Sequence, residues 1–274
     1  MRFVDFHMHS TFSDGVNTPE ELVRSACGAG IVAMSLTDHD TLKGLPRMAA
    51  ATREKGIGFI PGVELSTRIQ GKNVHILCYG VRLDCTILTE RLTDIRYARK
   101  DRLYRMLDKL KALGIELDIP EPEPGQRAVG RPHLARALVA QGYVKDIEEA
   151  FSLYLGDGKP AYEPQPKMSP EEGVALAHKA GALAVMAHHE EVGDRELVAR
   201  LLDTLPFDGL EVYHPSARRP DLQAYWLEEA ERRGLLITGG SDFHGSSGRF
   251  PEQLGIFSVE AEKTAAFLAR FGLE

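Results

Sequence analysis

Two histidines stand one residue apart in the stretch Asp5-Phe6-His7-Met8-His9-Ser10-Thr11-Phe12-Ser13-Asp14-Gly15, which follows a strand predicted over residues 2–6. Residues i and i+2 of a strand point to the same side, so His7 and His9 can direct two imidazoles at one point. Such a pair fits a metal ion, although two unrelated histidines at the end of an edge strand would give the same pattern. The rest of the chain must decide between these interpretations.

The composition is that of a globular protein with a sizeable core. With 274 residues, 43% of them hydrophobic, the chain suits one large α/β barrel or a core domain with a small insert. The net charge of −7 provides no general basic surface, so a surface for duplex nucleic acid is not expected. An anionic substrate would have to be attracted locally, by arginine, lysine and metal ions.

The sequence predicts a cytoplasmic protein. Cys27, Cys78 and Cys85 share no metal-like spacing, and an odd, sparse count argues against a disulfide framework. The N-terminus lacks the basic segment and apolar run of a signal peptide, and no apolar run is long enough to cross a bilayer. We therefore expect no membrane partner, and the composition gives no indication of the oligomeric state.

Strand and helix patterns alternate along most of the chain. Helices begin at motifs such as Thr18-Pro19-Glu20-Glu21 and Ser169-Pro170-Glu171-Glu172, where a cap residue, a proline and a capping-box glutamate follow in order. About seven or eight strands joined by helices predict a mainly parallel sheet and favour a barrel. Strand patterns, with a hairpin formed by residues 65–69 and 74–79, occur over residues 2–6, 31–36, 58–63, 65–69, 74–79, 182–187, 207–212, 235–238 and 254–259.

The alternation breaks in the middle of the chain. Residues 86–113 read as one long helix with an apolar stripe, and two shorter helices are expected between residues 131 and 155. We therefore expect a barrel domain over residues 1–85 and 168–274, and a helical insert domain over residues 86–167. Proline-rich loops are expected over residues 120–125 and 156–167.

Residues able to bind metal concentrate at the predicted ends of strands. In a (β/α) barrel these ends meet on one face, where active sites form. Imidazoles and carboxylates without thiolate clusters suit Zn, Mn or Fe at a hydrolytic site. The candidates exceed what one ion uses, so two or three ions are expected, which would clamp a phosphoryl oxygen and generate hydroxide. They are His7, His9, His39, His188, His189, His214 and His244, together with Asp14, Asp38, Glu64 and Asp242.

Several candidates have specific support from their neighbours. Asp242 and His244 flank Phe243 and repeat the same-side geometry of the first pair. Glu64 ends an apolar strand, where a buried carboxylate without a partner would be costly, so a ligand role is favoured. Around His39, the acidic residues Asp38 and Asp40 are interpreted either as groups that orient ligands or as helix caps.

The other histidines leave alternatives open. His75 lies early in its strand and is either a ligand or a hydrogen-bonded core histidine. His188 and His189 point to opposite faces if their strand continues, so only one of them is expected to be a ligand. His214 fits a ligand, a substrate contact or a surface residue. His178, in the middle of a helix, is expected to be structural or exposed.

Together these motifs resemble the PHP (polymerase and histidinol phosphatase) family of metal-dependent phosphoesterases, which is related to the amidohydrolases. The resemblance implies a distorted (β/α)7, TIM-like barrel that binds two or three divalent ions, with Mn, Zn or Fe as the candidates. The matching stretches, in the family's order along the chain, are 5–15, Thr37-Asp38-His39-Asp40, Gly62-Val63-Glu64, Ala187-His188 and Gly240-Ser241-Asp242-Phe243-His244.

The resemblance also implies a set of ligands for each ion. One ion would take His7, His9, Glu64 and Asp242. A second would share Glu64 and add His75 and His188, and a third would take Asp14, His39 and His244. Family members commonly have proline after the histidine of the fourth stretch, where this chain has His189. Histidinol phosphatases of this type often carry histidine where this chain has Asp14, which argues against that substrate.

The insert resembles one subgroup of the family. The stretches Gly130-Arg131-Pro132-His133-Leu134-Ala135-Arg136-Ala137-Leu138 and Leu155-Gly156-Asp157-Gly158-Lys159-Pro160-Ala161-Tyr162 are similar to the subgroup that removes the 3′-phosphate of nucleoside 3′,5′-bisphosphates. Members of it also act on short RNA from the 5′ end, and their insert caps the active site. Arg131, His133 and Lys159 are the predicted substrate-binding residues, because cations near a helix start or in a glycine-flanked loop can hold phosphate.

The sequence thus predicts a metal-dependent phosphatase in which a metal-bridging hydroxide attacks phosphorus. His214 or His189 is the predicted proton donor to the leaving oxygen. The substrate would be a small phosphorylated nucleotide or a short oligonucleotide, and the alternative activity is a 5′→3′ exonuclease on short RNA or DNA. Another phosphoesterase, a C–N hydrolase and a non-enzymatic metal-binding accessory module are less favoured.

Overall fold

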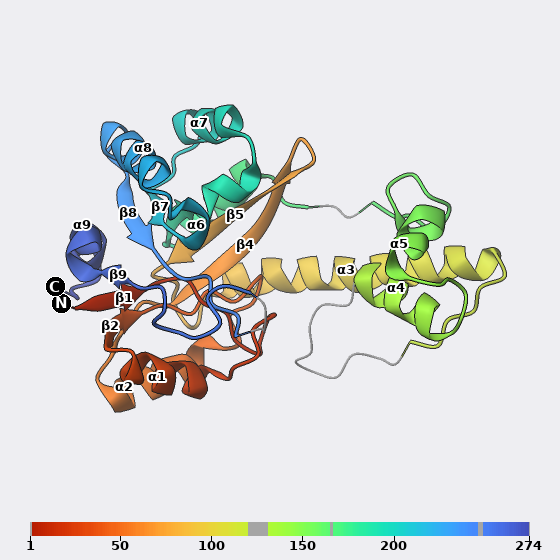
Figure 1. Ribbon diagram of the computed structural model, residues 1–274, viewed down its shortest axis with the longest axis horizontal. Coiled ribbons are helices and arrows are strands. Elements are labelled where there is room, and N and C mark those ends of the chain that lie inside the picture. Colours follow the sequence, from red (N-terminus) through yellow and green to blue (C-terminus); the bar gives the residue numbers. More distant parts are fainter. Residues whose placement is uncertain (1, 120–130, 165–166, 246–248, 274) are drawn as a thin grey trace. The chain divides into compact units, whose positions relative to one another are not determined.

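The computed structural model describes residues 2–119, 131–164, 167–245 and 249–273, and divides into two compact units. The first unit consists of Met1–Thr89 and Lys167–Glu274, and the second of Glu90–Pro166. The loop expected over residues 120–125 lies outside the described residues. Figure 1 shows the elements of both units.

The first unit is built on two sheets, which confirms the predicted α/β class. The smaller sheet has the order β3-β2-β1-β9 and the larger the order β4-β5-β6-β7-β8. The smaller sheet contains β1 (Phe3–Asp5), β2 (Ile31–Met34), β3 (Gly58–Phe59) and β9 (Val259–Glu260). The larger contains β4 (Gly62–Ile69), β5 (Lys72–Tyr79), β6 (Leu183–Met186), β7 (Gly209–Tyr213) and β8 (Leu236–Gly239).

Two isolated parallel bridges connect the sheets, and one of them shows that Glu64 lies near the start of β4, not at the end of a strand as its sequence predicts. One joins Met8, beyond β1, to Phe243, beyond β8. The other joins His39, beyond β2, to Glu64 in β4. The strands themselves form two separate sheets over the part of the chain that the structure describes, whereas the expected barrel is a single closed one. The bridges therefore carry chain segments from both sheets into one region.

The strand β5 runs antiparallel to both of its neighbours, β4 and β6. Residues early in β5 therefore lie beside residues at the end of β6, because the two strands run in opposite directions. The carbonyl of His75 accepts a hydrogen bond of 3.1 Å from the N–H of Ala187, the residue that precedes His188. This direction explains how a histidine near the start of its strand reaches the end of the sheet where the other histidines lie.

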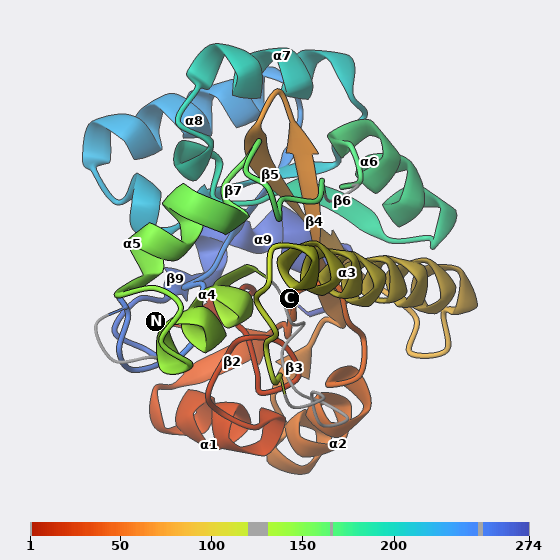
Figure 2. The ribbon, with the colours of Figure 1, turned by 90° about the vertical axis from the view of Figure 1, so that its right-hand side faces the viewer.

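Helices cover both sheets of the first unit. Figure 2 shows α1 and α2 side by side next to β2 and β3, and α6, α7 and α8 around the larger sheet. Thr18 and Ser169 each cap a helix with a complete capping box and a proline in the first turn, as their sequences predict. The helices are α1 (Pro19–Gly28), α2 (Leu45–Lys55), α6 (Pro170–Lys179), α7 (Arg195–Thr204), α8 (Pro220–Arg232) and α9 (Ala265–Ala269).

The second unit is helical and has its own core. It contains most of α3 (Thr86–Ala112), together with α4 (Arg131–Ala140), α5 (Ile147–Ala150) and a π-helical turn, Phe151–Leu155. Leu103, Met106 and Leu110 of α3 pack in one cluster with residues of α4. Among the described residues, no helix combines the length and the apolar character that crossing a membrane requires.

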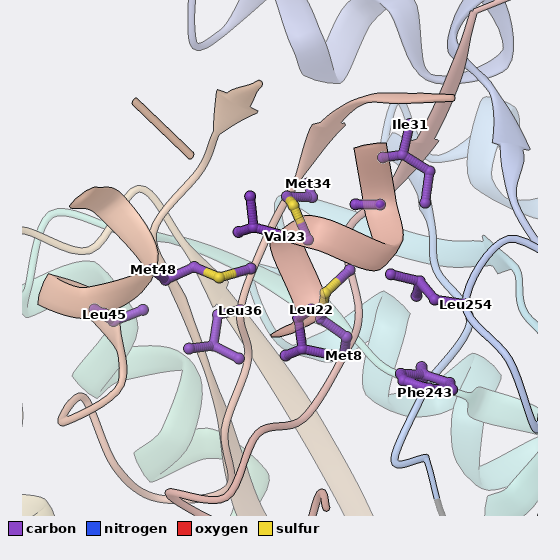
Figure 3. Packing of buried hydrophobic residues seen from close by; sticks show 11 residues of the cluster. Met8, Leu22, Val23, Ile31, Met34, Leu36, Leu45, Met48, Phe243 and Leu254 are labelled. Carbon is purple, nitrogen blue, oxygen red and sulfur yellow. The ribbon is translucent and has the colours of Figure 1, made fainter. Parts of the chain in front are cut away.

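A hydrophobic cluster anchors the strand ends of the first unit. Met8 and Phe243 pack in it with Leu22 of α1, Met34 of β2 and Met48 of α2 (Figure 3). Met8 is the middle residue of the His7-Met8-His9 triplet, and Phe243 is the middle residue of Asp242-Phe243-His244. Because alternate residues of an extended chain face opposite sides, burying the two middle residues turns their polar neighbours the other way.

The close approach of the strand ends depends on Gly240. A Cβ atom added there would lie 2.4 Å from both the Cβ and the backbone N of His7. We expect Gly240→Ala to lower the free energy of unfolding by at least about 2 kcal/mol, because the backbone must move to relieve the contact. Gly28→Ala is the control, since a Cβ at that helical position meets nothing within 4 Å. Urea unfolding of both variants measures the difference, and equal stabilities would contradict the expectation.

Candidate metal centre

The structure brings together the nine residues that the sequence predicts as metal ligands. Their donor atoms form overlapping groups in which all members lie within 4.8 Å of one another. His188 joins them through a contact with Glu64. The groups are His7, His9, Glu64 and Asp242; His9, Asp14, His39 and His244; and His39, Glu64 and His75.

The carboxylate of Glu64 lies at the centre of these groups and is fully buried. Its Oε2 atom is 3.2 Å from His7 Nε2, 3.1 Å from His9 Nε2 and 3.1 Å from His39 Nδ1. These three rings come from the segments that follow β1 and β2, whereas Glu64 itself belongs to β4. One oxygen therefore faces imidazoles from the smaller sheet.

The other oxygen of Glu64 faces imidazoles from the larger sheet. Its Oε1 atom is 2.7 Å from His75 Nδ1 and 2.8 Å from His188 Nε2. His75 lies in β5, and His188 follows β6. A carboxylate that presents each of its oxygens to a different set of nitrogens has the arrangement needed to bridge two cations.

Two further carboxylates complete the cluster. Asp242 Oδ1 lies 3.0 Å from His9 Nε2 and 3.3 Å from His7 Nε2. Asp14 Oδ1 lies 3.2 Å from His244 Nε2, and its Oδ2 lies 4.0 Å from His39 Nε2. Asp14 is half-exposed whereas Glu64 is buried, so the cluster extends from the interior toward solvent.

Three ring nitrogens show that this cluster suits metal ions. His9 Nε2, His39 Nδ1 and His244 Nε2 are buried and have no hydrogen-bond partner among the described residues. Each nevertheless lies 3.0–3.2 Å from a carboxylate oxygen, without the direction that a hydrogen bond needs. Buried donors that converge without bonding one another fit a shared cation, and nitrogen with carboxylate oxygen suits Zn, Mn or Fe.

Backbone strain is concentrated at the same place. Positive φ angles occur at His188 (20°), Asp242 (50°) and Asp40 (50°), three non-glycine residues at or beside the cluster. Such angles are unfavourable for residues with a Cβ and persist when surrounding contacts impose them. The tertiary contacts thus keep these three residues in backbone conformations that they would rarely adopt alone.

The charges of the cluster shift pKa values in opposite directions. Burial alone would raise the pKa of Glu64, but the surrounding histidines, above all His39 and His7, lower it well below its ordinary value. Burial alone would lower the pKa of His188, but its hydrogen bond to Glu64 raises it to about 9. Carboxylates that hold protons on these imidazoles also favour divalent cations, so metal binding would release protons.

Comparison with known proteins agrees with this geometry. A family model described as the PHP domain matches residues 5–229. The chain is 37% identical to a 3′,5′-nucleoside bisphosphate phosphatase of Chromobacterium violaceum, over 91% of this chain and 90% of the relative. It is 34% identical to a 5′-3′ exoribonuclease of Haemophilus influenzae, over 88% and 89% of the two chains.

A solved structure also resembles this chain along nearly its whole length. A Bifidobacterium adolescentis protein, described as a proposed metal-dependent phosphoesterase, superimposes with a TM-score of 0.73 and 30% identity. The match covers 97% of this chain and 96% of the other. The chain belongs to the PHP domain family. It is therefore a metal-dependent phosphoesterase, as its motifs predict.

Glu211 of β7 is a member of this PHP site that the sequence analysis missed. Its buried Oε1 lies 2.9 Å from His7 Nδ1, and its Oε2 accepts a hydrogen bond of 2.7 Å from the N–H of His188. It thus holds two of the predicted ligands in position. The signal was available, because an isolated glutamate between Leu210 and Val212 in an apolar strand resembles the situation of Glu64.

Asp38 and Asp5 hydrogen-bond the chain segments that carry the predicted ligands. Asp38 accepts hydrogen bonds of 2.7 Å from the N–H and the hydroxyl of Ser10 and from the hydroxyl of Ser13. It therefore fastens the loop that carries Asp14, which is the orienting role rather than the helix-cap role. Asp5 is fully buried and accepts from the N–H of His7 and of Ser241, and burial raises its pKa to about 7.

The two predicted proton donors occupy different surroundings. His214 is buried, and its Nε2 lies 3.9 Å from Asp242 Oδ2. It also forms a group of possible metal ligands with His7 and Glu211. His189 belongs to none of these groups within the described residues and packs edge-on against Trp226, with ring centroids 4.3 Å apart. Their role as proton donors stays a prediction.

The predicted substrate-binding residues lie in the second unit. Arg131 donates a hydrogen bond of 2.6 Å to Asp157, and its guanidinium lies 5.6 Å from the ring centroid of Tyr162 and 5.7 Å from that of Phe151. His133 is partly buried at the start of α4, and Lys159 is exposed. Their contact with substrate stays a prediction.

We expect Glu211→Gln to weaken metal binding by about 10-fold to 100-fold, because it removes the charge that orients His7 without changing the side chain's shape. Competition with a chelating dye measures the affinity for Mn or Zn. Glu190→Gln is the control, since Glu190 contacts Trp226 and Arg195 instead of the cluster. An unchanged affinity in Glu211→Gln would contradict the expectation.

We expect His189 to make the fold sensitive to acid. Burial lowers its pKa to about 4 from an ordinary value of 6.5. The unfolded chain therefore binds a proton in this window that the folded chain does not, so stability falls as pH decreases from 6.5 toward 4. His189→Phe should reduce this loss, by about 3 kcal/mol at most.

Urea unfolding across this pH window gives the comparison. The matched control is His178→Phe, because the His178 side chain is 37% exposed and pairs with Asp208. Equal acid sensitivity in the wild type and His189→Phe would show that His189 is not responsible.

Proposed function

We propose that this PHP-domain protein removes the 3′-phosphate of nucleoside 3′,5′-bisphosphates. The observation that carries the proposal is the convergence of six imidazoles and two further carboxylates around the buried Glu64, a donor set that fits several divalent ions. The similarity to the bisphosphate phosphatase of C. violaceum, which covers most of both chains, supports the choice of substrate.

The proposed ligand sets are those that the family resemblance implies, and they overlap with the observed groups of donors. His7, His9, Glu64 and Asp242 would hold one ion. A second would be held by Glu64 with His75 and His188, and a third by Asp14 with His39 and His244. Bound ions at such a site polarise phosphoryl oxygens and make water a strong nucleophile at neutral pH.

The residues around the ligands would orient the ligand side chains. Glu211 fixes the ring of His7, and Asp38 fixes the loop of Asp14. His214 is the favoured proton donor to the leaving oxygen. Its ring lies 3.9 Å from Asp242, whereas His189 belongs to none of the donor groups among the described residues. Arg131, His133 and Lys159 are proposed to bind the second phosphate of the substrate.

We also propose that the two sheets act as one distorted (β/α)7 barrel. The bridges Met8–Phe243 and His39–Glu64 would close a ring of β1, β2, β4, β5, β6, β7 and β8. In such a ring the ends of β1, β2, β6 and β8 would share one face, beside Glu64 near the start of β4 and His75 of the antiparallel β5.

The alternative is a 5′→3′ exonuclease on short RNA or DNA. The similarity to an exoribonuclease of H. influenzae, nearly as extensive as that to the phosphatase, favours this second candidate. Both activities would use the same ions and differ in the length of substrate accepted.

Phosphate release from adenosine 3′,5′-bisphosphate tests the proposal. We expect release with added Mn, none after chelation, and recovery when the ion is restored. His9→Ala should lower the rate by about 100-fold or more, because it removes an imidazole shared by two donor groups. His178→Ala should keep full activity, since that ring pairs with Asp208 outside the cluster.

Comparison with a five-nucleotide RNA separates the two candidates. Faster turnover of the mononucleotide supports the phosphatase, and faster turnover of the strand supports the exonuclease. Absence of phosphate release with Mn, Zn or Fe would reject the proposed phosphatase.

A further inference from the structure

Arg249 places a cation beside the metal centre that the proposed function leaves unused. Its Nη2 lies 2.6 Å from Asp242 Oδ2, while the other oxygen of Asp242 faces His7 and His9. The Arg249 side chain is 45% exposed, whereas that of Asp242 is 9% exposed. Arg249 therefore lies on the solvent side of a predicted ligand, where a substrate would approach.

The next residue adds an aromatic surface to this position. Phe250 is 46% exposed, and the guanidinium of Arg218 lies 5.1 Å from its ring centroid. Arg218 follows the short 3-10 helix Pro215–Ala217, which begins directly after His214. Segments that follow β7 and β8 thus meet here, and together they present two guanidinium groups and one aromatic ring.

We propose that Arg249, Phe250 and Arg218 form a nucleotide subsite of the first unit. Arg249 binds a phosphoryl oxygen of the substrate, and Phe250, supported by Arg218, stacks on the base. This inference rests on the proposed function and names residues that bind its substrate.

The chemistry of the three residues fits a nucleotide. A guanidinium has five donors in a planar fork, so Arg249 can contact Asp242 and still offer donors to phosphate. In a chain of net charge −7, two exposed arginines, of which Arg249 contacts the predicted ligand Asp242, give the local positive charge that an anionic substrate needs. Aromatic rings bind bases by stacking, with little dependence on which base is present.

A purely structural role for Arg249 would give different results. If the arginine only held Asp242 in position, its loss would lower metal content and affect every substrate in proportion. A substrate contact instead lowers turnover at full metal occupancy. The aromatic part of the subsite acts only when the substrate has a base.

The experiment compares two substrates on the metal-loaded full chain, adenosine 3′,5′-bisphosphate and the base-free ribose 3,5-bisphosphate. We expect Arg249→Gln to lower kcat/KM by about 100-fold on both, with unchanged metal content and partial recovery in Arg249→Lys. Phe250→Ala should raise KM by about tenfold for the nucleotide alone. Arg219→Gln, whose arginine pairs with Asp221, is the matched control and should resemble the wild type.

Two results of this kinetic comparison would overturn the inference. One is a loss of metal that accounts for the whole loss of activity in Arg249→Gln. The other is a Phe250→Ala variant that behaves alike on the two substrates. Calorimetry with adenosine 5′-monophosphate keeps the inference separate from the proposed function. Weaker binding in Arg249→Gln and Phe250→Ala supports the subsite even if the wild type does not hydrolyse the bisphosphate, and unchanged binding rejects it.

Discussion

The structure of the site depends on one buried carboxylate, that of Glu64. Its two oxygens lie 2.7–3.2 Å from five imidazoles that come from the segments around β1, β2, β5 and β6. An isolated carboxylate at zero exposure would be very costly, so this position is tolerable only when positive charge surrounds it. The histidine-bearing segments must therefore lie close together around Glu64. The Glu64 carboxylate links the two sheets electrostatically, and its backbone bridge to His39 links them through the main chain.

The apolar core holds in place the segments that carry this charge cluster. Met8 and Phe243 are fixed among Leu22 and Met34 (Figure 3), so the polar residues on either side of each are turned toward the cluster of predicted ligands. Gly240 lets the two segments approach closely enough for the contact to form. Hydrophobic burial thus stabilises an arrangement of charges that would be unfavourable alone, and strained angles such as that of Asp242 can persist.

Local periodicity explains what the sequence could predict. The pairs His7/His9 and Asp242/His244 follow from the alternation of an extended chain, and the helix starts at Thr18 and Ser169 follow from capping chemistry. The role of His75 could not be predicted alone, because it depends on the antiparallel direction of β5. Glu211 was detectable as a charge in an apolar strand, but its partners lie on β1 and beyond β6, and only the tertiary structure identifies them.

Asp242 would connect the metal centre to substrate recognition in the proposed subsite. Its Oδ1 faces the interior histidines, and its Oδ2 faces Arg249. A divalent ion bound by Oδ1 would withdraw electron density from the carboxylate, which weakens the attraction of Oδ2 for the guanidinium. The donors of Arg249 would then be available to an incoming phosphate. In such an arrangement the carboxylate would position the arginine beside the site, and the guanidinium would contact the carboxylate and the phosphate together.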